Sequence, residues 1–313
     1  MKIPACVYTP NYRSVPALGD VGPDNEWQRL DPSNVVFWNN RYWITYTKAV
    51  AKKNLYTGTV WAAVSDDGVH WTEVGEARDK GQADAWDNFG VITPYMVPWE
   101  GKFYLFYTAS HEKAGEAWAV RGENNKRHIG VAVADEPQGP YKRIKDTPVL
   151  SPGVEGEWDS YLVDDTHILY RNQKFWLYYK GGDKNVTVDT TKWGVAVSDC
   201  LTGPYVKYGN NPFLDSGHTV CVWKQGCGVV ALVDTAGPQK NTMQYSEDGL
   251  HFVKTADVVL GHDIGTAPYD AAAHTETDSA PGVTWGMTAG GITQEEGGIP
   301  YLKRFEVDCE QPE

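Results

Sequence analysis

Residues 163–182, VDDTHILYRNQKFWLYYKGG, have the pattern of a β-hairpin: an apolar run, a polar turn over residues 171–173, and a second run rich in aromatic residues. The second run, KFWLYYKGG, aligns without gaps with RYWITYTKA (residues 41–49) and KFYLFYTAS (residues 102–110). Each copy follows a short apolar run and a polar turn, so the same hairpin occurs three times. A fourth copy, TVCVWKQGCGVVALV, begins at Thr219.

A second hairpin follows the first in each repeat. Its turns contain Asp, Gly and Pro, which supply either a positive φ angle or a preset one. Its copies are AVSDDGVHWTEV (63–74), AVADEPQGPYKRI (132–144), AVSDCLTGPYVKY (196–208) and QYSEDGLHFVKT (244–255). Weaker material for a fifth repeat lies in VTWGMTAGG (283–291) and GIPYLKRFEV (298–307).

Two hairpins in each repeat make four strands, and a period of roughly 50 to 70 residues is that of a propeller blade. The sequence contains no long amphipathic helical pattern, which argues against α/β folds. A β-sandwich is the alternative, but it would not require the same two hairpins to recur in the same order. We therefore predict an all-β fold, a five-bladed β-propeller, in which residues 1–313 form a single domain.

Charge and hydropathy exclude two classes of partner. The net charge of -13, the pI near 5.1 and the lack of a Lys/Arg-rich run argue against nucleic acid. A membrane span is not predicted, because no run of about eighteen apolar residues occurs. The first 19 residues lack the basic and apolar regions of an export signal, so we expect a cytoplasmic or periplasmic protein.

The cysteines do not form a complete disulfide framework, because their number is odd. Cys221 and Cys227 could face each other across a hairpin, but we expect them to be two buried free thiols. The five cysteines are Cys6, Cys200, Cys221, Cys227 and Cys309.

The innermost strand of a propeller blade begins near the central channel, so the residues just before each first hairpin should converge on one mouth of that channel. These residues are Asp31, Thr93 with Pro94, Asp164 with Asp165, and His218. Two carboxylates flanking a sugar ring are the usual equipment for cleaving a glycosidic bond. Histidine can replace one of them as the acid if a nearby carboxylate keeps it protonated. In the alternative interpretation Asp31 caps its strand through an Asx-turn and His218 is an ordinary loop histidine.

Other residues near the predicted mouth are candidates for contacts with a sugar, because aromatic rings stack on the apolar faces of sugars. Asp87, in the sequence WDN, could bind a sugar hydroxyl or cap its own loop. His167 lies two residues beyond Asp165 and could pack inside its strand or support the site from behind. The predicted substrate-binding residues are Asp164, Thr93, Trp86, Asp87, His167, Thr219 and Trp223.

Four segments carry a more specific signal. They are RLDPSNV (29–35), WDNFGVITPYMV (86–97), WDSYLVDDTHILY (158–170), and SGHTVCVW (216–223) with the following GPQKNTMQYSEDGLHF (237–252). Together they resemble glycoside hydrolase family 117, and the last segment is the most specific part. The resemblance implies a five-bladed propeller that removes 3,6-anhydro-α-L-galactose from the non-reducing ends of agar oligosaccharides.

The resemblance also implies catalytic roles. Asp31 would be the general base that activates water, His218 the general acid, and Asp165 the carboxylate that tunes the acid, with inversion at the anomeric carbon. Two positions depart from the family pattern: Asp164-Asp165-Thr166 replaces an expected His-Asp-Pro, and Thr219 replaces an expected Glu. These departures indicate a divergent branch that acts on this or a related galactan.

Two further features follow from the resemblance. One divalent cation could lie near the active site, with Asp164 as an added oxygen ligand, although an acid pair without a metal fits equally well. Family members form homodimers through an N-terminal helical segment. Residues 1–22 are rich in Pro and Gly and do not predict a helix, so dimerisation by that route is not expected.

Two other functions stay open at this point. A propeller hydrolase acting on arabinose or xylose linkages would use a glutamate as its acid, and Glu155 and Glu157 are the candidates near the third repeat. A sugar-binding propeller without catalysis would not need Asp31, Asp165 and His218 together.

Overall fold

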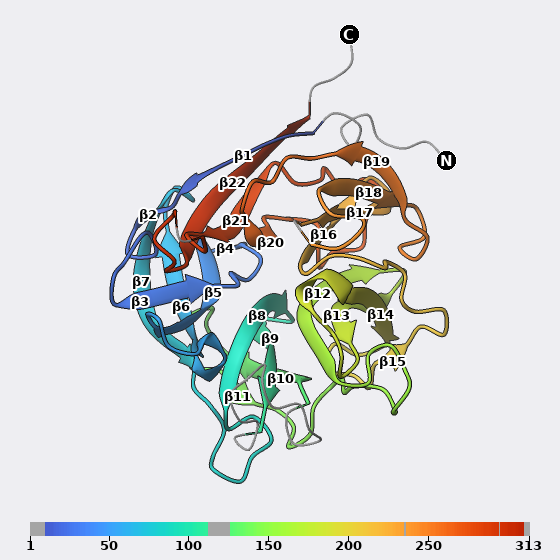
Figure 1. The fold of residues 1–313 in the computed structure, drawn as a ribbon, viewed down its shortest axis with the longest axis horizontal. Coiled ribbons are helices and arrows are strands. Elements are labelled where there is room, and N and C mark those ends of the chain that lie inside the picture. Colours follow the sequence, from blue (N-terminus) through green and yellow to red (C-terminus); the bar gives the residue numbers. More distant parts are fainter. Residues whose placement is uncertain (1–9, 112–125, 235, 294, 310–313) are drawn as a thin grey trace.

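The computed structural model describes residues 10–111, 126–234, 236–293 and 295–309, which form five sheets around a central axis (Figure 1). The predicted all-β, five-bladed β-propeller is therefore confirmed. The helical segments of this part of the chain are two short 3-10 turns, η2 (Leu55–Thr57) and η5 (Val188–Thr190). None of the helices in these residues has the length and apolar character needed to cross a membrane.

Each blade runs outward from the axis as an antiparallel sheet. The first blade pairs β3 (Trp27–Leu30) and β4 (Val36–Trp38) with β5 (Arg41–Val50), followed by β6 (Thr59–Ser65), β7 (His70–Arg78) and the short parallel β2 (Leu18–Gly19). The second contains β8 (Gly90–Trp99), β9 (Lys102–Ser110), β10 (His128–Ala134) and β11 (Lys142–Arg143). The third contains β12 (Leu162–Arg171), β13 (Lys174–Gly182), β14 (Lys192–Ser198) and β15 (Val206–Lys207). The fourth contains β16 (Val220–Gln225), β17 (Gly228–Val233), β18 (Thr242–Ser246) and β19 (Val253–Asp257).

The fifth blade differs from the sequence prediction in two strands. Residues 283–291 and 298–307 contain β21 (Trp285–Gly290) and β22 (Tyr301–Cys309), but the inner strand is β20 (Ile264–Pro268) and the outer strand is β1 (Pro10–Pro16). β20 is only five residues long and contains both Gly and Pro, so it carries little strand pattern. β1 comes from the other end of the chain and pairs with β22 from Pro10↔Cys309 to Pro16↔Lys303, next to it in Figure 1.

The repeated inner hairpins turn through two residues with positive φ, the type I′ geometry that matches the twist of the paired strands. The turns are Asn39-Asn40, Glu100-Gly101 and Asn172-Gln173, with φ between 49° and 75°. The equivalent turn of the fourth blade is Gly226-Cys227. Cys227 is consequently exposed, in contrast to the expected buried thiol, whereas Cys221 is buried and free as expected. Cys6 lies outside the described residues.

The hydrophobic core lies between the blades. Each of five large clusters joins two neighbouring blades, including the first and the fifth, so the clusters close a ring. Ile168 and Leu177 of the third blade, for example, pack with Val97 and Phe106 of the second. The inner strands are thus fixed from both sides, which positions the residues at their amino ends.

A Trp-Asp pair anchors the loop that leads into each of the second and third blades. Trp86 stacks on Tyr107 with ring centroids 6.0 Å apart, and the Tyr107 hydroxyl donates to Asp87 at 2.9 Å. Trp158 stacks on Tyr179 at 5.6 Å, and the Tyr179 hydroxyl donates to Asp159 at 2.9 Å. The WDN and WDS sequences are therefore two copies of one structural clamp.

A glycine faces each of these clamps, and we expect alanine there to destabilise the fold. At Gly130 a Cβ atom would lie 2.6 Å from the Tyr107 ring, and at Gly194 it would lie 2.7 Å from the Trp158 ring. Gly130→Ala and Gly194→Ala should each lower the free energy of unfolding by about 1–3 kcal/mol, as overpacking does elsewhere. Gly209→Ala is the control, because its Cβ would meet no atom within 4 Å. Equal denaturant midpoints for the three variants would contradict the clamp.

Candidate active site

The inner strands of four blades begin with the same backbone distortion. Asp31, Thr93 and Asp165 have φ values of 49°, 46° and 47°, and Gly265 has a φ of 63° in the fifth blade. In three of these blades the distortion coincides with a shift in strand register, between Ile92 and Tyr95, Asp164 and His167, and Ile264 and Ala267. Positive φ is costly for residues other than glycine, by about 1–3 kcal/mol, and such strain gathers at functional sites.

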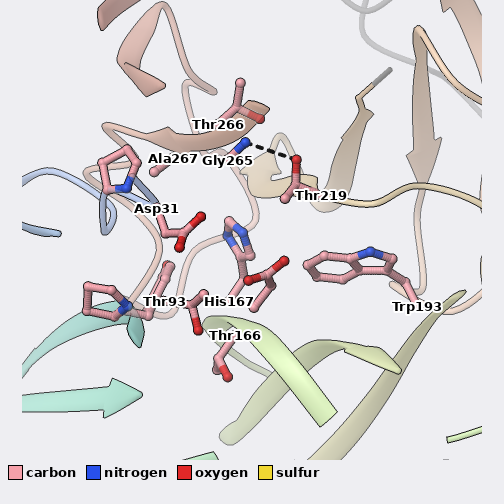
Figure 2. Close-up of a pocket in the computed structure, with 13 residues that line it drawn as sticks. Asp31, Thr93, Thr166, His167, Trp193, Thr219, Gly265, Thr266 and Ala267 are labelled. Atoms are coloured by element: carbon pink, nitrogen blue, oxygen red, sulfur yellow. Dashed lines mark hydrogen bonds between the residues drawn. The ribbon is translucent and has the colours of Figure 1, made fainter. Parts of the chain in front are cut away.

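The residues at and beside these distortions line one cavity with an empty volume of about 360 Å³. Figure 2 shows Asp31, Thr93 and His167 around this space. The complete lining consists of Asp31, Pro32, Thr93, Pro94, Tyr95, Asp165, Thr166, His167, Trp193, Thr219, Gly265, Thr266 and Ala267. The prediction that the blade starts converge is therefore confirmed for Asp31, Thr93, Pro94 and Asp165.

Asp31 is a partly buried acid with few hydrogen-bond donors near it. Its Oδ2 lies 3.3 Å from Thr47 Oγ1, and the same hydroxyl oxygen accepts a bond from the backbone N–H of Thr93 at 2.9 Å. Burial, followed by the negative charge of Asp165, raises the pKa of Asp31 to about 8. This carboxyl group therefore keeps its proton at neutral pH.

The adjacent acids Asp164 and Asp165 have different environments. Asp164 is buried, and its Oδ2 lies 2.7 Å from Arg127 Nη1 and 3.6 Å from Lys180 Nζ. Its Oδ1 accepts from Thr93 Oγ1 at 3.1 Å and from the backbone N–H of Asp165 at 2.9 Å. Burial alone would raise the pKa of Asp164, but Lys180 and Arg127 hold it well below its usual range. Asp164 is a permanent anion that lies behind the cavity, so the prediction that it contacts substrate has no support.

Asp165 lies on the cavity side of the pair. Its Oδ2 accepts a short hydrogen bond from Lys180 Nζ. Burial raises the pKa of Asp165, Lys180 lowers it and the charge of Asp164 raises it again, with a net value of about 7. Asp31 and Asp165 thus place two carboxyl groups in one cavity, where the charge of Asp165 helps to raise the pKa of Asp31.

His218 is next to the cavity in the chain. The carbonyl oxygen of Gly217 accepts bonds from Thr191 Oγ1 at 3.0 Å and Trp193 Nε1 at 3.1 Å, and these bonds fix the backbone before His218. The imidazole is half-buried and is not part of the cavity lining. Burial, Lys180 and Arg127 lower its pKa, against the opposing charge of Asp164, to about 3. In the free protein His218 is therefore neutral.

Thr219 occupies the position where the family 117 pattern has a glutamate, and its hydroxyl makes two hydrogen bonds. Its hydroxyl donates to Asp234 Oδ2 at 2.5 Å and accepts from the N–H of Gly265 at 3.0 Å, the bond drawn in Figure 2. Burial raises the pKa of Asp234 to about 6. This contact joins the fourth blade to the distorted strand of the fifth.

Three other predicted substrate contacts lie away from the cavity. Trp223 is only 2% exposed and packs in the cluster between the fourth and fifth blades, because its side chain points away from the channel. Asp87 is fully buried and bound by Arg78, Arg143 and Tyr107, so its carboxylate has no free face for a sugar. Trp86 is partly buried in the clamp on Tyr107 and does not line the cavity. His167 and Thr219 do line it.

The sequence interpretation missed several residues of the site. Lys180 occupies the seventh place of KFWLYYKGG, where the other two copies have Thr47 and Thr108, and this exchange of threonine for lysine was a readable signal. Gly265 lies in IGTA (264–267), the structural counterpart of ITPY (92–95), but the two stretches share only the isoleucine, so the pattern carried little signal for it. Arg127 and Trp193 gave no comparable signal, because they lie outside the first hairpin of their blades. Arg127 directly precedes β10, and Trp193 lies in β14.

The residues do not fit the divalent cation that the family resemblance implies. Asp164, the predicted additional ligand, is already bound by Arg127, Lys180 and Thr93. Within the described ranges no group of three or more His, Cys, Asp or Glu side chains is arranged to hold a metal ion.

Comparison with known proteins finds similarity to glycoside hydrolases. The model of glycosyl hydrolases family 43 matches residues 27–185, about half of the chain. The family 117 glycoside hydrolase Zg3597 of the marine bacterium Zobellia galactanivorans is 28% identical in sequence and has a TM-score of 0.85, over 97% of this chain and 92% of that one. No curated protein matches the sequence significantly.

More distant structures share the fold. The GH43_1 enzyme of Xanthomonas citri, solved with xylotriose, is 13% identical with a TM-score of 0.59, over 97% of this chain and 92% of that one. The endo-arabinase of Bacteroides thetaiotaomicron is 13% identical with a TM-score of 0.58, over 91% and 96%. The chain therefore belongs to the propeller glycoside hydrolases that the family 43 model describes, and it is a divergent member that resembles family 117.

Proposed function

We propose that this glycoside hydrolase is an exo-acting, inverting enzyme. It releases a terminal sugar, 3,6-anhydro-α-L-galactose or a related residue, from oligosaccharides of red-algal galactans. The observation that carries the proposal is that the carboxyl groups of Asp31 and Asp165 line one cavity, with His218 in the field of the same Lys180 and Asp164. The similarity to family 117 supports the choice of sugar.

The roles follow from the positions of the three groups. Asp31 takes a proton from the attacking water, and His218 gives a proton to the oxygen of the leaving sugar. Asp165 lies between the ammonium group of Lys180 and the cavity, and its charge adjusts the electrostatic field at Asp31 and His218. Attack by a water molecule opposite the leaving group inverts the anomeric carbon.

The size of the cavity supports exo action. All the space between its lining atoms, open solvent included, amounts to about 360 Å³. Such a cavity accommodates the end of a chain more readily than its middle.

In the resting protein, the proton that His218 must donate to the leaving sugar resides on Asp31. The pKa of Asp31 is raised to about 8 and that of His218 is lowered to about 3, so the carboxyl group holds the proton. The reactive form contains the same number of protons, with one moved from Asp31 to His218. Binding of a sugar, which changes the hydration of both groups, must bring their pKa values together for efficient turnover.

The raised pKa of Asp31 has a consequence for stability. An unfolded Asp ionises near pH 4, whereas folded Asp31 keeps its proton until about pH 8, so Asp31 makes the fold progressively less stable across that interval. Asp31→Asn removes this penalty. The stability of Asp31→Asn relative to the wild type should increase by at least about 2 kcal/mol between pH 5 and pH 8.5, measured by urea unfolding. Asp146→Asn, at a side chain that is 98% exposed, is the control and should show no such trend.

The pH dependence of catalysis should report the ionisation of Asp31. We expect kcat/KM to fall as the pH rises through about 8, where Asp31 loses its proton. Steady-state rates between pH 5 and pH 10 measure this limb. A rate that stayed constant to pH 10 would place the proton elsewhere.

Substitution of the acid or the base should abolish most of the activity. Asp31→Asn and His218→Ala should each lower kcat/KM by roughly 100-fold or more while the protein stays folded. The assay follows monosaccharide release from neoagaro-oligosaccharides by chromatography. Asp66→Asn, at an exposed turn of the first blade, should keep full activity. Full activity of His218→Ala on the natural substrate would disprove its role.

A second candidate is cleavage of arabinose or xylose linkages, which the family 43 match favours. That activity calls for a glutamate acid. No glutamate lines the described cavity, and both Glu155 and Glu157 are exposed to solvent. The substrate panel should therefore include arabinan and xylan oligosaccharides, and release from these alone would favour the second candidate.

A further inference from the structure

A second cavity lies farther along the same inner strands. In the first blade, Asp31 and Pro32 line the catalytic cavity, and residues 34–37 line the second cavity. In the second blade, Tyr95 lines the catalytic cavity and Pro98 lines the second cavity. The second cavity has an empty volume of about 730 Å³. Its lining consists of Asn34, Val35, Val36, Phe37, Pro98, Tyr269, Asp270, Ala271, His274 and Thr275. The two cavities therefore lie at successive levels of the propeller axis.

One buried tyrosine separates the two cavities. Tyr95 lines the catalytic cavity and is 1% exposed. Its ring centroid lies 5.3 Å from that of His167, in the catalytic cavity, and 6.0 Å from that of His274, in the second cavity. Its hydroxyl donates to the carbonyl oxygen of Ile168 at 3.2 Å. A column of polar aromatic side chains thus connects one cavity to the other.

Three buried polar atoms beside this column have no hydrogen-bond partner among the described residues. They are Thr166 Oγ1, His167 Nδ1 and His274 Nε2. A buried polar atom without a partner is destabilising, and folded proteins usually satisfy such groups with a protein partner or with ordered water. Burial lowers the pKa of His167 to about 3 and of His274 to about 4, so both rings are neutral and each can accept as well as donate a bond.

We propose that a file of ordered water molecules passes Tyr95 and carries water from the second cavity to the catalytic cavity. This role rests on the proposed function. Each turnover consumes one water: its oxygen bonds to the anomeric carbon, its proton goes to Asp31, the glycosidic C–O bond breaks, and His218 protonates the leaving oxygen. A terminal sugar that fills the small catalytic cavity blocks the open side. The attacking water must then come from the opposite side, where the file ends.

The direct test is a crystal structure of the protein at a resolution that shows ordered water. We expect water molecules within hydrogen-bond distance of Thr166 Oγ1, His167 Nδ1 and His274 Nε2. A dry column, or direct protein partners for all three atoms, would overturn the proposal. This arm needs no substrate, so it can fail or succeed independently of the proposed hydrolase activity.

The kinetic test uses a variant that blocks the opening of the second cavity, where the proposed file of water begins. Ala271 is exposed and lines the second cavity, so Ala271→Trp places a ring at its opening without disturbing the core. It should lower kcat roughly tenfold, or about 1.4 kcal/mol of activation free energy, with KM nearly unchanged. Val206→Trp adds the same ring at an exposed outer strand of the third blade and should have no effect. An unchanged kcat for Ala271→Trp would exclude supply of water by this route.

A second pair of variants separates polarity from packing. His274→Leu removes the polar atom beside Tyr95 and should lower kcat, whereas His274→Gln keeps a hydrogen-bonding group and should restore most of it. Thermal unfolding of both variants controls for lost stability. Equal rates for His274→Leu and His274→Gln, at equal stability, would contradict a role for His274 in conducting water.

Discussion

The ammonium group of Lys180 makes it possible to bury three acids at the mouth of one channel. It contacts both Asp164 and Asp165, and Arg127 provides a second cation on Asp164. Asp31 adds a third carboxyl group, which stays protonated. Two cations and the proton on Asp31 therefore balance three carboxyl groups. Without the cations, burial and mutual repulsion would neutralise all three acids, because isolated charges are very costly in a protein interior.

The same polar groups hold the blades in register. Thr47 of the first blade bonds both Asp31 and the backbone of Thr93 in the second. Thr93 in turn bonds Asp164 in the third blade. Across the ring, Thr219 of the fourth blade bonds Gly265 of the fifth. The catalytic geometry and the packing of neighbouring blades thus depend on one set of hydrogen bonds, which explains why strained backbone at Asp31, Thr93 and Asp165 is retained.

The fold was largely predictable because hairpins are local and recur with recognisable turns. KFWLYYKGG and its copies give both the strands and the positions that begin each blade. Strand β1 could not be predicted, since its pairing with β22 joins opposite ends of the chain. Asp31 and Asp165 were found through the repeat register. The opposite behaviour of Asp164 and Asp165 was not predictable, because it depends on Arg127, which precedes β10 in the neighbouring second blade. Trp223 was misplaced, since sequence position alone does not tell which face of a strand a side chain occupies.

The pairing of β1 with β22 also affects how the enzyme matures. Among the described strands, β1 is synthesised before and β22 after all the others, and the fifth blade lacks a strand until these two pair. The first four blades can form while the chain is still growing. The cavity cannot, because Gly265, Thr266 and Ala267 belong to the fifth blade. A chain that stops before the fifth blade is therefore a partial ring with an incomplete cavity, and the ring closes only when β1 pairs with β22.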